Sequence, residues 1–185
     1  MKKQIDGLIH RTMWISIALF VLRALISWES VRAETDIYAL FGFAGEAIGV
    51  AAIIMVCYEK WIWRVDPLVK IPYIAGKYKG SIKSTYNQEI KEASLIIKQS
   101  LLSVEVTLNT DESESRSISG SVEEVLGKPE LIYTYLNEPT VKAKDKSSIH
   151  HGTATFIISD KRHLIGQYYT DRNTAGDMDF IKESK

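Results

Sequence analysis

Two long apolar runs occupy the first seventy residues, and each contains one charged residue. The first, Met13–Trp28, includes Arg23, and the second, Ile37–Trp63, includes Glu46. A helix needs roughly 20 mostly apolar residues to cross the hydrocarbon core of a bilayer. The second run exceeds this length and the first reaches its lower limit. The pattern therefore predicts a hairpin of two transmembrane helices, with spans at about residues 13–29 and 37–58.

From Gly76 onward, apolar and polar residues alternate with a period of two in short segments separated by turn residues. This pattern predicts strands and no helix. The predicted strands are 76–86, 90–99, 101–109, 116–125, 131–137, 148–159, 164–171 and 177–182. Eight consecutive antiparallel strands favour an all-β, up-and-down β-barrel, because closure removes the exposed sheet edges. The interior of such a barrel is wide enough for one small ligand.

Pro67 and Pro72 separate the two patterns and mark a short linker. The predicted organisation is a hairpin over residues 1–64, a linker over residues 65–75 and a ligand-sensing barrel over residues 76–185.

The first apolar run has a second interpretation, a cleaved signal peptide, because Val31–Ala33 resembles a small-residue cleavage site. The charge of Arg23 inside the run favours a retained anchor.

The loop Glu29–Asp36 between the two runs is mainly acidic, whereas the flanks of the hairpin are basic. By the positive-inside rule, the chain is predicted to be a multi-pass membrane protein with both termini and the barrel in the cytoplasm. The flanking basic residues are Lys2, Lys3, Arg11, Lys60, Arg64, Lys70, Lys77 and Lys79.

A charged side chain inside a transmembrane span costs free energy, so the charged residues of the two spans are candidates for a functional role. Two arrangements are predicted for these charges. Either the side chains of Arg23 and Glu46 meet across the hairpin, or the side chain of Arg23 extends to the lipid headgroups. Gly42, Gly45 and Gly49 lie beside Glu46, and Gly45–Gly49 matches the GxxxG pattern that lets helices approach closely. This face is predicted either to associate with other copies of the chain or to pack the two helices of one hairpin.

Composition restricts the function further. The chain has 23 basic and 23 acidic residues, which argues against a broad basic surface for a nucleic-acid polymer. The single cysteine, Cys57, is predicted to be structural. His150 and His151 are adjacent, so alternation places them on opposite faces of a strand, and no metal site is predicted. No motif for nucleophilic, metal or phosphate-transfer chemistry is present, and we expect no enzyme and no cofactor.

The predicted inward faces contain more than aliphatic residues. Tyr78, Tyr133, Tyr135 and Tyr168 share strand parities with apolar or small residues, as do Asn137 and Thr170. Buried hydroxyls and amides require partners. Tyrosine rings also stack on nucleobases, a contact worth about 1–3 kcal/mol per base. The interior is therefore predicted to be either an ordinary core with satisfied tyrosines or a ligand pocket.

Several stretches of the barrel resemble one family. They are Ala75–Gly80 (AGKYKG), Leu131–Pro139 (LIYTYLNEP), His151–Ala154 (HGTA), Leu164–Arg172 (LIGQYYTDR) and Gly176. Behind two membrane spans, this order is similar to the two-transmembrane β-barrel effectors of bacterial cyclic-oligonucleotide antiphage signalling (CBASS). The resemblance covers nearly the whole chain, and its specificity lies in the order and spacing of the motifs.

The resemblance implies that the barrel is lipocalin-like and that it recognises a cyclic nucleotide, a di- or oligonucleotide made by a cognate CD-NTase after phage infection. It implies that binding drives homo-oligomerisation and that the transmembrane segments then disrupt the lipid of the inner membrane, causing growth arrest or death. Stacking faces, phosphate contacts and base or ribose contacts are expected at the mouth of the barrel. The predicted ligand-binding residues are Tyr78, Arg116, Tyr133, Tyr135, Asn137, His151, Tyr169, Thr170 and Arg172. The predicted membrane and oligomerisation residues are Arg23, Gly42, Gly45, Glu46 and Gly49.

Two other functions remain open at this point. A lipid-binding membrane protein of lipocalin type predicts an aliphatic interior and no role for Arg172. A structural subunit whose barrel docks a partner protein predicts no small-molecule ligand.

Overall fold

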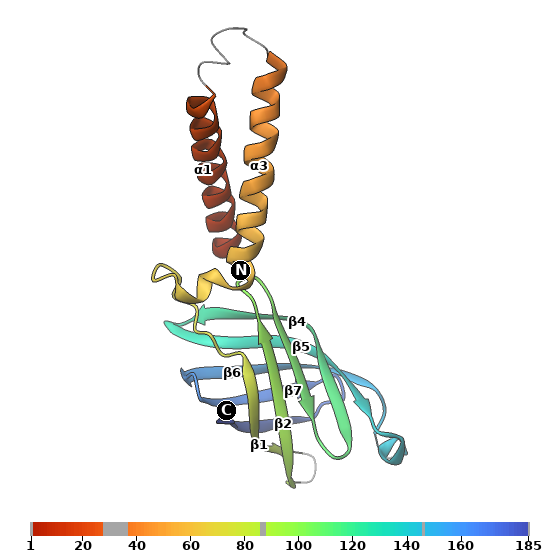
Figure 1. Ribbon diagram of the computed structural model, residues 1–185. Helices are drawn as coiled ribbons and strands as arrows, with labels where there is room; N and C mark the ends of the chain where they lie inside the picture. Colours follow the sequence, from red (N-terminus) through yellow and green to blue (C-terminus); the bar gives the residue numbers. More distant parts are fainter. Residues whose placement is uncertain (1, 28–36, 86–87, 146, 185) are drawn as a thin grey trace. The chain divides into compact units, whose positions relative to one another are not determined.

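A helical hairpin and a closed β-barrel follow one another along the chain in this computed structural model (Figure 1). The structure describes residues 2–27, 37–85, 88–145 and 147–184. The chain divides into two compact units, Met1–Asp66 and Pro67–Lys185. The acidic loop Glu29–Asp36, including Val31–Ala33, lies outside the described residues.

The hairpin consists of α1 (Lys2–Ile26) and α3 (Ile37–Lys60), followed by a short 3-10 helix, η1 (Ile62–Val65). Helix α1 begins well before the predicted span, because the helix includes the more polar residues that precede the apolar run. The segments Gln4–Ile26 and Tyr38–Lys60 are long and apolar enough to cross a membrane. In the first segment, no residue of the most apolar stretch is buried, and in the second segment 17% of that stretch is buried. The core helices of soluble proteins are mostly buried, so both segments differ from them.

Helix α3 packs against α1 through a narrow stripe of its surface. Ala47, Ala51 and Met55 are buried and follow one another at intervals of four residues, which places them on one face of the helix. Large apolar residues elsewhere on the helix, such as Ile53 and Val56, are exposed. The hairpin therefore has a small internal contact and a wide apolar outer surface.

Eight strands form one closed barrel in sequence order. Each strand pairs antiparallel with the next, and β1 pairs with β8 to close the sheet. The predicted eight-stranded up-and-down barrel is confirmed. The strands are β1 (Gly76–Ser84), β2 (Ile90–Gln99), β3 (Val104–Asn109), β4 (Ser113–Val125), β5 (Lys128–Pro139), β6 (His150–Asp160), β7 (His163–Thr170) and β8 (Ala175–Lys182).

Several strand ends lie two or three residues from their predicted positions, and two local features were not predicted. Strand β3 begins at Val104 and not at Leu101, because the N–H of Ser100 donates to the carbonyl of Ser103 at 2.9 Å and closes a turn there. The connection between β5 and β6 contains a 3-10 helix, η2 (Val141–Ala143), that the alternation did not predict. This connection contributes to the cavity described below.

The interior of the barrel changes character along its axis. Toward one end the inward side chains are apolar, as in Leu95, Leu131, Phe156 and Phe180, all fully buried. Toward the other end the same strands carry polar inward residues, as Asn137 does on β5. The apolar half supplies the core, and the polar half is left for a cavity.

The apolar end of the barrel is filled by the segment that precedes β1. Ile74 is fully buried, and its N–H donates to the side-chain oxygen of Gln99 at 2.8 Å. The amide nitrogen of Gln99 donates to the carbonyl of Pro72 at 3.0 Å. The Tyr78 hydroxyl donates to the carbonyl of Ile74 at 2.6 Å, and burial raises the pKa of Tyr78 to about 12. The buried polar side chains of this plug, Gln99 and Tyr78, thus both have partners, as burial requires.

Candidate functional site

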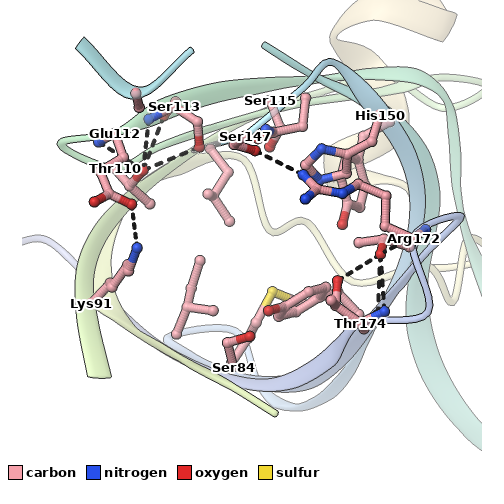
Figure 2. A pocket seen from close by; sticks show the side chains of 18 of the residues that line it. Ser84, Lys91, Thr110, Glu112, Ser113, Ser115, Ser147, His150, Arg172 and Thr174 are labelled. Carbon is pink, nitrogen blue, oxygen red and sulfur yellow. Dashed lines mark hydrogen bonds and ion pairs between the residues drawn. The ribbon is translucent and has the colours of Figure 1, made fainter. Parts of the chain in front are cut away.

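The polar end of the barrel opens into a cavity of about 570 Å³ (Figure 2). Every strand of the barrel contributes to its wall, together with Ala143 and Ser147 from the connection between β5 and β6. A volume of this size falls within the range of small-molecule sites.

Tyrosine rings form the inner part of the cavity. Tyr133 and Tyr135 are inward neighbours on β5, with ring centroids 5.9 Å apart, and Tyr133 stacks on Phe156 at 6.4 Å. Burial raises the pKa of both phenols well above the ordinary value, so both are neutral at physiological pH. A neutral phenol can donate and accept a hydrogen bond. The cavity therefore offers ring faces together with neutral polar atoms.

Two glycines make room for these rings. A Cβ atom at Gly152 on β6 would overlap the ring of Tyr135, and one at Gly176 on β8 would lie 2.5 Å from the ring of Tyr168. Only glycine allows the backbone of one strand to approach the ring on another this closely. Gly152 and Gly176, which both belong to the stretches that carry the resemblance, thus shape the cavity.

Ser115 and Asn137 add a neutral polar pair to the wall. They face each other across β4 and β5 and are 5% and 8% exposed. Within the part of the chain that the structure describes, neither side chain makes an intramolecular hydrogen bond. Buried polar groups are normally satisfied, and these two point into a cavity, so their donors and acceptors are available to a ligand.

Charged groups lie at the mouth of the cavity. Arg172, in the turn between β7 and β8, donates through Nη1 to the hydroxyl of Ser147 at 3.0 Å. Its turn is closed by Thr170 and Thr174, whose hydroxyl oxygens lie 2.6 Å apart. On another wall, Lys91 of β2 forms an ion pair with Glu112. Figure 2 shows these two groups on opposite sides of the opening.

The structure brings together five of the nine predicted ligand-binding residues. They line the cavity from β5, from β7 and from the turn after β7. They are Tyr133, Tyr135, Asn137, Thr170 and Arg172.

The other four predicted residues do not line this cavity. Tyr78 faces inward but lies at the plugged end. The remaining three lie on the outer face, because their neighbours in the strand face inward. Arg116 pairs with Glu114 at 2.5 Å, Tyr169 donates to Gln167 at 3.1 Å, and the Nδ1 of His151 lies 3.7 Å from Asp171.

Most of the residues that line the cavity were missing from the predicted set, and four of those with polar groups show why. Lys91 shares its parity with Ala93, Leu95 and Ile97, so a lysine on an apolar face was visible in the sequence. Tyr168 faces inward where the resemblance favoured its neighbour. Ser115 preceded the predicted start of its strand, and no pattern pointed to Glu112, which lies in a turn.

In the hairpin, Arg23 and Glu46 meet within one chain. The Arg23 Nε lies 3.0 Å from Glu46 Oε2, and the guanidinium lies 4.8 Å from the centroid of Phe43. The first of the two predicted arrangements is therefore the one observed.

The glycines of α3 do not contact α1. A Cβ atom added at Gly42, Gly45 or Gly49 would meet nothing within 4 Å outside the helix itself. The contact with α1 is made by the opposite stripe, which includes Ala47 and Ala51. In the described residues, the glycine face is thus an open surface of the hairpin.

The comparisons with known proteins agree with the resemblance. Residues 69–182 match the family model described as "Cap15, cyclic dinucleotide receptor domain". The chain is also 30% identical over 185 residues to CD-NTase-associated protein 15 of Staphylococcus schleiferi. That alignment covers 96% of this chain and 97% of the relative.

Proposed function

Since this chain belongs to the Cap15 cyclic dinucleotide receptor family, we propose that it is a CBASS effector whose barrel binds a cyclic dinucleotide made by a cognate CD-NTase. Binding promotes association between copies of the chain, and the hairpins then disrupt the bacterial inner membrane. The observation that carries the proposal is the cavity, which combines tyrosine faces, neutral polar groups that line its wall and an arginine at its mouth.

The cavity suggests how the ligand lies. Nucleobases are planar rings with polar edges, and they suit the neutral inner part, where Tyr133 and Tyr135 supply stacking faces. Asn137 and Thr170 supply groups for base edges or ribose hydroxyls. Phosphodiesters are anionic, and Arg172 offers a guanidinium that binds them with two parallel hydrogen bonds. A lipid-binding lipocalin would need an aliphatic cavity, and the charged and polar residues in this wall do not support that function.

Binding is tested by calorimetric titration of the full-length protein in detergent micelles with cyclic di-AMP, cyclic GMP–AMP and cyclic di-UMP. We expect saturable binding of at least one compound and its loss in Arg172→Ala. Arg116→Ala is the matched control, because it removes an arginine from the outer face and should leave affinity unchanged. Unchanged affinity in Arg172→Ala would remove this residue from the site. Absence of binding to a wider panel of cyclic di- and trinucleotides would contradict the proposed function.

The hairpin is proposed to act through its open glycine face. Small residues let transmembrane helices approach closely, and this face is not used inside the hairpin. Glu46 lies beside it, and a carboxylate on each of several helices requires protein or water around it. An assembly of hairpins would therefore carry polar groups through the bilayer, with both termini and the barrel on the cytoplasmic side.

Substitution of Gly45 by leucine tests this step. The single hairpin has space for the leucine, so Gly45→Leu should preserve the hairpin and ligand affinity while reducing self-association and toxicity. Val50→Leu is the control, because it enlarges an exposed residue away from the glycine face. Crosslinking in membranes and growth after induction are the measurements. Full toxicity and crosslinking in Gly45→Leu would show that the hairpins associate through another face.

A further inference from the structure

Among the residues that the structure describes, the mouth of the cavity contains charged side chains of both signs in equal number. Its charged side chains are the carboxylates Glu89 and Glu112 and the cations Lys91 and Arg172. A cyclic dinucleotide carries two phosphodiester charges, and these four described side chains together supply no net positive charge to attract them. The way in which each cation is paired therefore matters for binding.

The two cations have partners of different charge (Figure 2). Arg172 donates to the hydroxyl of Ser147, a neutral group that leaves the positive charge uncompensated by that contact. Lys91 is paired with the carboxylate of Glu112, which offsets its charge. Arg172 can therefore accept an anionic partner from a ligand, whereas Lys91 already has one, the carboxylate of Glu112.

The backbone that carries Glu112 is fixed, whereas its carboxylate has room to move. The hydroxyl of Thr110 accepts the N–H groups of Glu112 and Ser113 at 3.3 and 3.0 Å, and the carbonyl of Glu112 accepts the N–H of Thr140 at 2.8 Å. The side chain of Glu112 is 45% exposed and has three rotatable torsions. The carboxylate can therefore turn toward water without any change in the turn that holds it.

Building on the proposed function, we propose that Lys91 is a second phosphate-binding residue and that Glu112 is an internal counter-ion displaced by the ligand. The two phosphodiesters of a cyclic dinucleotide lie on opposite sides of its macrocycle, and Lys91 and Arg172 lie on opposite walls of the mouth. On binding, a phosphodiester replaces the carboxylate, so Lys91 has an anionic partner before and after. Glu112 competes with the ligand and sets the concentration at which the barrel becomes occupied.

The proposal predicts opposite effects for the two members of the ion pair. Full-length variants in detergent are titrated with cyclic di-AMP, cyclic GMP–AMP and cyclic di-UMP. Lys91→Gln should weaken binding about tenfold or more, because it removes a charge-assisted hydrogen bond. Glu112→Gln should tighten binding about two- to fivefold, because it removes a competitor whose ion pair is partly exposed. Lys91→Arg should retain binding and confirm that charge is the required property.

Glu114→Gln is the matched control for the charge change. It also removes a carboxylate and breaks an ion pair, the one with Arg116, but on the outer face of the barrel. Its affinity should equal that of the wild type at each salt concentration. Lys91→Gln should in addition lower the salt dependence of binding, since one fewer phosphate is neutralised.

The outcomes separate this inference from the proposed function. Binding by the wild type with unchanged or weaker affinity in Glu112→Gln would overturn the counter-ion role. Normal affinity and normal salt dependence in Lys91→Gln would overturn the phosphate-binding role. Absence of binding by the wild type to all three compounds would overturn the inference together with the function on which it rests.

Discussion

Replacement of Asn137 by leucine should make the barrel more stable and a poorer receptor. Asn137 is 8% exposed, and its carboxamide makes no intramolecular hydrogen bond within the described part of the chain. Leucine has a similar volume and no polar atoms. The substitution therefore removes a carboxamide without an intramolecular partner from the cavity wall of the ligand-free protein and removes a contact from the complex.

The size of the effect follows from the surroundings of the amide. Burial of a polar group without a partner costs about 1–3 kcal/mol in protein mutational data. The cavity is large enough to hold water around Asn137, so the lower part of this range applies, about 1 kcal/mol. For a unit of this size, that difference raises the melting temperature by about 3–6 °C. Loss of one hydrogen bond should weaken ligand binding about tenfold.

Differential scanning calorimetry of the full-length protein in detergent, with and without the cyclic dinucleotide, measures both effects. The barrel transition is the one that shifts with ligand. Asn137→Leu should raise it without ligand and reduce the shift that the ligand produces. Asn109→Leu, on the outer side of β3, is the control and should change neither value. A lower melting temperature in Asn137→Leu, with unchanged ligand affinity, would show that Asn137 is a structural residue.

Three further substitutions have defined outcomes. Gly152→Ala should displace the ring of Tyr135, cost about 1–3 kcal/mol of stability through overpacking and weaken ligand binding, as thermal melts and titration would reveal. Tyr78 has a folded-state pKa near 12 against an ordinary value of 10. The neutral phenol therefore contributes on the order of 2–3 kcal/mol to the unfolding free energy, and this contribution is complete below pH 10 and lost between pH 10 and 12. The unfolding free energy of Tyr78→Phe should accordingly fall less steeply over this range, and an equal slope would contradict the assignment. Gln99→Leu should leave the N–H of Ile74 unpaired, cost about 1–3 kcal/mol and accelerate hydrogen exchange at that amide, which mass spectrometry measures.

The alternation of apolar and polar residues predicted the strands of the barrel, because the direction of each side chain in a strand depends only on local backbone geometry. Every inward position of β5, from Leu131 to Asn137, could be identified by its parity with apolar neighbours. The same rule shows why Tyr169 lies outside the cavity, since Tyr168 and Thr170 on either side of it face inward. Where the chain alternates, side-chain orientation follows from the sequence.

Position along the barrel axis was harder to predict than orientation. Tyr78 and Tyr135 both face inward, but one closes the plugged end and the other lines the cavity. Their heights depend on the stagger of strands far apart in the sequence, which alternation does not specify. Glu112 was missed for a related reason, because a turn residue reaches the mouth only through the pairing of its two strands.

The plugged end has a kinetic consequence. Ile74, Gln99 and Tyr78 fill one end of the barrel, so a ligand reaches the cavity and leaves it through the same opening. A change that only narrows this opening, for example in the connection that carries η2, slows entry and exit by the same factor and leaves the equilibrium affinity unaltered. The lifetime of the occupied receptor, and with it the duration of a response to a brief pulse of ligand, can therefore be tuned independently of sensitivity.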